Sequence, residues 1–130
     1  TAIVFYTSEI GKAKVRNLSP QISSIVQYIG LNMYTKITVR QIAQYFSMSE
    51  ARLRTAFKKE MNISIHNYIL RRKISEAKVM LKSNYPINDI SLLLGFSDTS
   101  HFTKVFKKIT GTTPKKYQMS VDSKFTLNLD

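Results

Sequence analysis

Two stretches of the chain place basic and hydroxyl side chains along one side of a short helix. They lie within residues 50–61 and 99–110, and in both the apolar residues recur at the spacing of a buried helical face. The side chains on the other face are Lys, Arg, Ser, Thr and His, with an acidic residue only at the ends of the first stretch. Such donors can bind phosphate groups and the edges of bases, so each stretch suits the groove of a nucleic acid.

The segment before the second stretch reads as a short helix that ends at a glycine. Gly95 stands where a left-handed cap would end that helix. Ser97 or Asp98 can then cap a second helix, which we expect to run to about Thr110 and to be closed by Gly111. Two short helices joined by a tight turn predict a helix-turn-helix. The buried face of the first helix is expected to carry Ile87, Ile90, Ser91 and Leu94.

Residues 39–68 repeat the pattern of residues 87–117. The turn of the second copy is one residue longer than the turn of the first copy. In this first copy Thr38 caps a helix over 39–46, Ser47 and Met48 make the turn, and Ser49 caps a helix over 50–61. Two copies of one bihelical unit are the simplest interpretation. The matched pairs are Ile42 with Ile90, Leu53 with Phe102, Phe57 with Phe106, Ser64 with Thr113, and Tyr68 with Tyr117.

The expected fold is all-α, with two helix-turn-helix subdomains, each a homeodomain-like bundle, joined by a long linker helix. A boundary is expected at Ser19-Pro20, because Pro favours the first turn of a helix. The predicted segments are a linker or the end of a missing upstream domain (1–19), the first subdomain (20–63), the connecting helix (64–84), the second subdomain (85–119) and a tail (120–130).

The connecting helix is predicted to be polar on one face. At about 1.5 Å per residue, a helix over 64–84 is about 31 Å long. This is close to the ~34 Å between successive major-groove segments on one face of B-DNA, so the helix could hold both units on adjacent segments. The residues assigned to its polar face are Arg71, Arg72, Lys73, Lys78 and Lys82.

The charge balance predicts a polyanionic partner. The chain has 20 Lys and Arg residues against 8 Asp and Glu, which gives a formal net charge of +12 spread over both copies and their connector. No apolar run approaches the ~20 residues of a spanning helix, and no signal-peptide pattern is present. With 0 cysteines as well, we expect a cytoplasmic protein that does not enter a membrane.

The second copy resembles the signature segment of AraC/XylS-type transcription regulators, and the resemblance extends over residues 20–119. It is carried by the isoleucine-rich helix followed by Gly95-Phe96, Phe102, Phe106-Lys107-Lys108, Gly111, Pro114 and Tyr117. In the first copy, Ser47 and Asn62 replace glycines usual in the family, and Met48 replaces its turn aromatic. The resemblance implies the C-terminal DNA-binding domain of a bacterial transcription regulator, most often an activator. It also implies contacts with RNA polymerase and an effector or dimerisation domain upstream.

The two second helices supply the candidate DNA contacts. Arg54, Thr55 and Ala51 match reading positions of the family, and the second helix offers no arginine, so we expect it to contribute more to positioning than to sequence choice. The candidates for base contacts are Ala51, Arg52, Arg54, Thr55, Thr99, Ser100, His101, Thr103 and Lys104. The candidates for phosphate contacts are Arg40, Lys58, Lys59, Lys107, Lys108, Lys115 and Lys116.

A basic helical adaptor that binds RNA or acidic proteins by charge alone is the alternative, and loss of sequence preference on duplex DNA would identify it. An enzyme is not expected, because the chain shows no paired nucleophile and base, no Gly-rich phosphate loop and no set of metal ligands. His66 and His101 are too far apart in sequence to suggest a metal site, and no cofactor is predicted.

Overall fold

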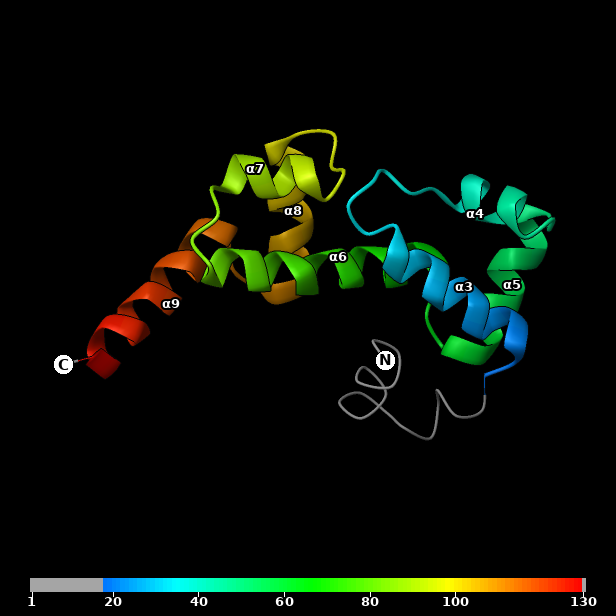
Figure 1. Ribbon diagram of the computed structural model, residues 1–130, viewed down its shortest axis with the longest axis horizontal. Helices are drawn as coiled ribbons and strands as arrows, with labels where there is room; N and C mark the ends of the chain where they lie inside the picture. Colours follow the sequence, from blue (N-terminus) through cyan, green and yellow to red (C-terminus); the bar gives the residue numbers. More distant parts are fainter. Residues whose placement is uncertain (1–17, 130) are drawn as a thin grey trace. The chain divides into compact units, whose positions relative to one another are not determined.

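The computed structural model describes residues 18–129, with side chains described as far as Val121. Within this range every regular element is a helix (Figure 1), as the sequence predicted. The helices are α3 (Pro20–Leu31), α4 (Val39–Tyr45), α5 (Glu50–Met61), α6 (Ile65–Lys82), α7 (Ile87–Leu93), α8 (Thr99–Thr110) and α9 (Pro114–Leu129). The predicted linker over 1–19 falls almost entirely outside the described residues.

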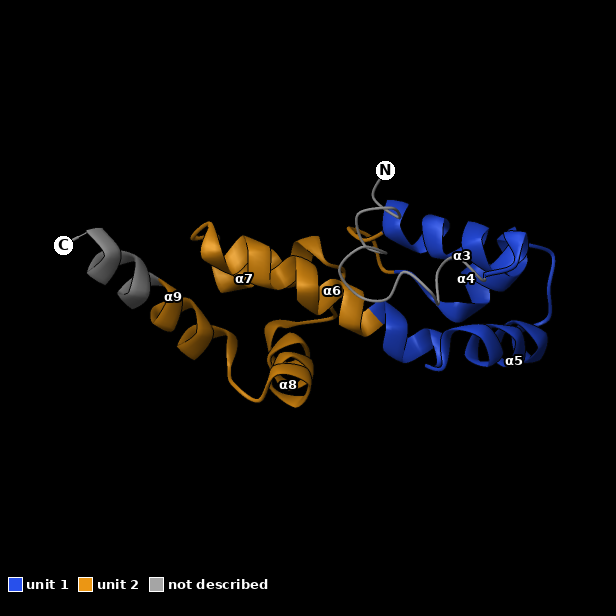
Figure 2. Ribbon diagram, turned by 90° about the horizontal axis from the view of Figure 1, so that it is seen from below, with its two compact units in different colours: residues 1–32, 37–69 blue, residues 33–36, 70–130 orange. Residues whose placement is uncertain are grey.

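The chain folds as two compact units, shown in different colours in Figure 2. The first contains α3, α4, α5 and the start of α6 as far as Ile69. The second contains the rest of α6 from Leu70 onward, together with Met33–Lys36, the loop between α3 and α4. The sequence had placed this loop in the first subdomain.

In the first unit, serine and threonine caps set where the helices begin. The Ser19 hydroxyl accepts from the backbone N–H of Ile22 at 3.3 Å, and the Ser19 N–H and hydroxyl donate to the Glu60 carboxylate of α5 at 2.7 and 2.8 Å. Thr38 and Gln41 form a reciprocal capping box at the start of α4. The N-terminal end of α3 is therefore tied to α5 by hydrogen bonds as well as by packing. The buried apolar residues of this unit are Ile22, Ile25, Val26, Ile29, Val39, Ile42, Ala43, Leu53, Phe57, Ile65, Tyr68 and Ile69.

Two residues that replace family glycines do adopt left-handed backbone. Ser47, in the turn between α4 and α5, has φ 54°, and Asn62, at the end of α5, has φ 60°. Asn tolerates this region through local hydrogen bonding, whereas a left-handed serine costs about 1 to 2 kcal/mol. The turns therefore keep the geometry that glycine would give.

A series of aromatic contacts runs through the core of the second unit. The ring centroids of Phe96 and Phe102 are 5.2 Å apart, those of Phe102 and Phe106 5.8 Å, and those of Phe106 and Tyr117 5.7 Å. These separations lie in the favourable range for tilted and edge-to-face pairs. Asp98 caps α8 by accepting from His101 N–H at 2.7 Å. The buried cluster comprises Ile74, Ala77, Met80, Leu81, Ile90, Leu94, Phe96, Phe102 and Phe106.

Two features of the second unit differ from the prediction. The last helix, α9, continues to Leu129, where the sequence predicted an end near Met119 and a tail. Lys73 was assigned to the polar face of the connecting helix, and this prediction is wrong: the residue is only 5% exposed. Its ammonium is satisfied by backbone carbonyls, which periodicity cannot reveal.

Two serine substitutions compare a buried hydroxyl in the second unit with a helix cap in the first unit. The buried Ser91 hydroxyl has no hydrogen-bond partner among the described residues. Because such a group has lost its hydration without replacement, Ser91→Ala should leave the free energy of unfolding unchanged or raise it by up to about 1 kcal/mol. Ser49→Ala, which removes the cap of α5, should lower it by about 1 kcal/mol. Urea unfolding measures both, and an equal loss at the two positions would contradict this account of Ser91.

Candidate nucleic-acid interface

The orientation of α5 is fixed by its apolar face. Leu53 and Phe57 are 0% exposed, and Phe57 packs against Tyr68 with ring centroids 5.3 Å apart. The opposite face is consequently presented to solvent. All the candidates from α5 lie exposed there: Ala51, Arg52, Arg54, Thr55, Lys58 and Lys59. Four of them, Arg54, Thr55, Lys58 and Lys59, line one shallow depression of the surface, which groups base-contact and phosphate-contact candidates.

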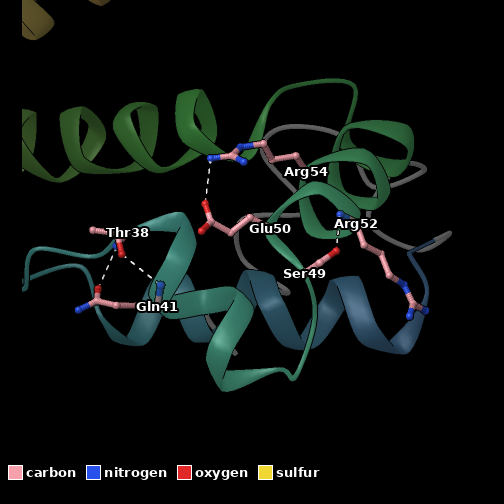
Figure 3. A network of polar contacts seen from close by, with 6 residues as sticks. All are labelled: Thr38, Gln41, Ser49, Glu50, Arg52 and Arg54. Atoms are coloured by element: carbon pink, nitrogen blue, oxygen red, sulfur yellow. Dashed lines mark hydrogen bonds and ion pairs between the residues drawn. The ribbon is translucent and has the colours of Figure 1, made fainter.

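The two arginines of α5 point in different directions. Figure 3 shows Arg54 reaching back one turn to Glu50, where the guanidinium and carboxylate are 3.3 Å apart, while Arg52 extends away from this pair. The side chains of Arg54 and Glu50 are 58% and 43% exposed, so breaking the pair costs at most about 1 kcal/mol. The ion pair therefore orients the Arg54 side chain, and the guanidinium remains accessible to a ligand.

The surface of α8 offers mainly short donors. Ser100, His101 and Lys104 are exposed, whereas Thr99 and Thr103 are half-buried. The Thr99 hydroxyl donates to Asn88 Oδ1 of α7 at 2.8 Å, so it ties the start of α8 to the preceding helix. Of the candidates from this helix, Thr99 has the least freedom to meet a base.

The His101 ring is also held locally. It lies against Phe96 with ring centroids 5.4 Å apart, and its Nδ1 is 3.4 Å from the Ser97 hydroxyl. The apolar contact keeps the ring beside the turn while one edge faces solvent.

The phosphate-contact candidates occupy helix ends in both units. Arg40 is exposed in the first turn of α4, in the first unit. In the second unit, Lys107 and Lys108 are exposed in the last turn of α8, and Lys115 and Lys116 in the first turn of α9. Each unit thus carries exposed cations in addition to the exposed donors of α5 or α8, and exposed cations of this kind can bind phosphate groups.

The turn before α8 is packed against the α3–α4 loop. Gly95 has φ 76°, and a β-carbon at this position would lie 2.6 Å from the backbone oxygen of Thr35. The corresponding residue of the first copy, Ser47, carries a side chain at φ 54° and is exposed. Glycine is therefore required at position 95 by a neighbouring backbone as well as by its own conformation.

Sequence reasoning missed the two residues that hold these donors in place. Glu50 stands four residues before Arg54, a spacing that brings side chains together on a helix, so the pair could have been found. Asn88 could not, because its bond to Thr99 depends on how α7 and α8 pack.

The exposed donors of α5 and α8 can bind anions. Among residues 18–121 no three His, Asp or Glu side chains come together as a metal site would require. None of the helices in the described part combines the length and apolar character needed to cross a bilayer.

Comparison with known proteins agrees with this geometry. Residues 42–120 match the sequence model of a helix-turn-helix domain family. The chain is 30% identical over 100 residues to the arabinose operon regulatory protein of Escherichia coli K12, a match that covers 75% of the chain and 34% of that protein. Among the most similar curated relatives, the share of the relative's length that the chain spans lies between 13% and 42%. These relatives are transcription regulators rather than enzymes.

Solved structures of transcription regulators share the fold of this chain. The C-terminal domain of AraT, a response regulator from Geobacillus stearothermophilus, superposes with a TM-score of 0.77 at 26% identity, and the match covers 80% of this chain and 88% of that one. The DNA-binding domain of AdpA, solved in complex with a target DNA, also has a TM-score of 0.77. Its identity is 15%, with 82% of this chain and 96% of that chain covered, so it shows the fold alone.

Two glycine substitutions separate the cost of backbone conformation from the cost of contact. Gly95 and Gly111 have φ of 76° and 86°, so alanine at either should cost about 1 to 2 kcal/mol of unfolding free energy. A β-carbon at Gly111 would meet nothing within 4 Å, whereas one at Gly95 meets backbone. Gly95→Ala should therefore cost at least about 1 kcal/mol more than Gly111→Ala in urea unfolding. Equal costs would mean that the loop yields freely.

Proposed function

Because this chain belongs to the AraC-type helix-turn-helix family, we propose that it binds double-stranded promoter DNA sequence-specifically, with α5 and α8 inserted in adjacent major-groove segments. One observation carries the proposal. Both helices bury an apolar face and present a solvent face of donors, as a reading helix must. A protein that bound polyanions by charge alone would not need two helices with the same arrangement of a buried apolar face and an exposed face of donors.

The two helices are proposed to have unequal roles. On α5, Arg54 and Arg52 can make bidentate contacts to guanine, and Thr55 can meet a thymine methyl group. Base contacts are also proposed for Ala51 and, on α8, for Ser100, His101, Thr103 and Lys104. The short side chains of α8 discriminate weakly, so this helix contributes more to position than to sequence choice. Thr99, with its hydroxyl engaged by Asn88, is proposed to support the helix rather than to meet a base.

The basic side chains at the helix ends are proposed to hold the DNA backbone. Each phosphate contact releases a counterion, so these residues give affinity that falls steeply with salt and is independent of sequence. The residues assigned to this role are Arg40, Lys58, Lys59, Lys107, Lys108, Lys115 and Lys116.

The regulatory context is proposed from the family. The relatives are larger bacterial regulators, so we propose that this domain acts with an effector or dimerisation domain in a transcription activator that contacts RNA polymerase. A cytoplasmic location fits this role and stays a prediction.

Selection from a randomised duplex library at ~150 mM salt tests the proposal, since nonspecific binding is weak under these conditions. Two enriched motifs about 10 base pairs apart are expected, one for each reading helix. One motif would assign base reading to a single unit. Binding without enrichment, lost as salt rises, would instead support the adaptor that binds RNA or acidic proteins by charge.

Two substitutions on α5 distinguish reading from anchoring. Arg54→Ala should cost about 1 to 3 kcal/mol on the selected sequence and relax the choice at one base pair. Lys58→Ala, on the same helix, should weaken specific and random duplexes alike and reduce the salt slope by about one unit. Titrations of both variants at several salt concentrations measure these effects. Equal losses on specific and random DNA for Arg54→Ala would remove it from the base readers.

A further inference from the structure

Lys73 is a buried cation in the second unit, and none of the acidic side chains that the structure describes pairs with it. Its Nζ donates to the backbone oxygen of Met33 at 3.0 Å, to that of Thr35 at 2.7 Å, and to that of Leu94. The first two oxygens belong to the loop between α3 and α4. The third belongs to Leu94, the residue directly after the end of α7. One ammonium group therefore joins this loop to the turn that precedes α8.

The chemistry of the site favours a protonated lysine. An ammonium has three N–H donors, and three carbonyl oxygens accept them here. Burial lowers the pKa of Lys73 to about 8, so the group is still mostly charged at neutral pH. The negative end of α7 also stabilises a cation, and the last turn of α7 carries no basic residue of its own. Lys73 supplies from α6 the charge that this helix end lacks.

Independent contacts seat the same loop. Met33 is only 4% exposed. The Tyr34 hydroxyl donates to Glu76 of α6 at 2.6 Å, a bond that raises the pKa of Tyr34 to about 12. Gly95 approaches the Thr35 backbone so closely that no β-carbon fits between them. The loop is thus held against both α6 and the turn.

The turn after α7 is linked to α8 by backbone hydrogen bonds and by one aromatic contact. The Gly95 and Phe96 N–H groups donate back to Leu92 and Ser91 at 3.1 and 3.0 Å. Phe96, 7% exposed, packs against Phe102 of α8. A displacement of the Leu94 carbonyl would therefore move the residues against which α8 begins.

We propose that Lys73 is a positioning residue for DNA reading, which fixes the entry of α8 by clamping the α3–α4 loop onto the turn between α7 and α8. The proposal rests on the proposed function for its effect on DNA, but the clamp itself can be tested without DNA. Lys73 is buried, so it would not contact a base or a phosphate itself. Its effect on DNA binding would act through α8 and not through α5.

Amide hydrogen exchange of the complete chain tests the clamp. Lys73→Met removes the ammonium, and Lys82→Met is the control, because it removes the same charge from an exposed position of the same helix. In Lys73→Met the Gly95 and Phe96 amides should exchange about tenfold faster or more, as expected for the loss of charged hydrogen bonds. The Phe106 amide should change no more than in Lys82→Met. Equal acceleration at Phe96 and Phe106 would overturn the proposal, since Lys73 would then stabilise the whole unit.

Footprinting on the selected duplex tests the consequence for reading. Lys73→Met should weaken protection of the α8 half-site about tenfold and leave the α5 half-site within about twofold, whereas Lys82→Met should affect both alike. Lys73→Arg, which keeps the charge and the donors, should restore most of the protection. Equal loss at both half-sites, or no rescue by arginine, would overturn the proposal. If the wild-type chain selects no sequence, the proposed function fails, and hydrogen exchange alone decides the clamp.

Discussion

The burial of a short aromatic stripe controls what the second unit can present to solvent. Phe102 and Phe106 lie one turn apart on α8 and are both 0% exposed. Removing either side chain would cost about 3 to 5 kcal/mol, far more than any exposed polar contact on that helix contributes. The rotation of α8 about its axis is therefore fixed by packing, and Ser100 and Lys104 face outward as a consequence. Leu53 and Phe57 fix α5 in the same way in the first unit.

Features that depend on neighbours in sequence were predictable. Thr38, Ser49 and Asp98 cap α4, α5 and α8, because each side chain needs only the N–H groups of the following turn. The buried and exposed faces of α5 and α8 followed from periodicity for the same reason. The order of the helices and both helix-turn-helix units were therefore accessible before any coordinates. The left-handed conformation of Asn62 was consistent with its residue type.

Features that depend on distant backbone were not predictable. Helical spacing placed Lys73 among the exposed cations of the connecting helix, since residue type and period were the only information. Its acceptors lie 40, 38 and 21 residues away, and they are carbonyl groups, which every residue possesses. The bond between Asn88 and Thr99 was hidden for a similar reason. The site could thus be outlined from its donors, but not from the groups that hold them.

The assignment of Met33–Lys36 to the second unit has a consequence for modularity. In the sequence the two helix-turn-helix motifs look like separate consecutive modules. In the structure the chain enters the second unit at Met33, returns to the first unit at Ile37 and enters the second unit again at Leu70. No single cut divides the protein into two complete units, because every cut between Asn32 and Leu70 leaves one of them without a segment that it uses. Recombination that exchanged only the C-terminal half would deliver α8 without the loop that seats the turn before it.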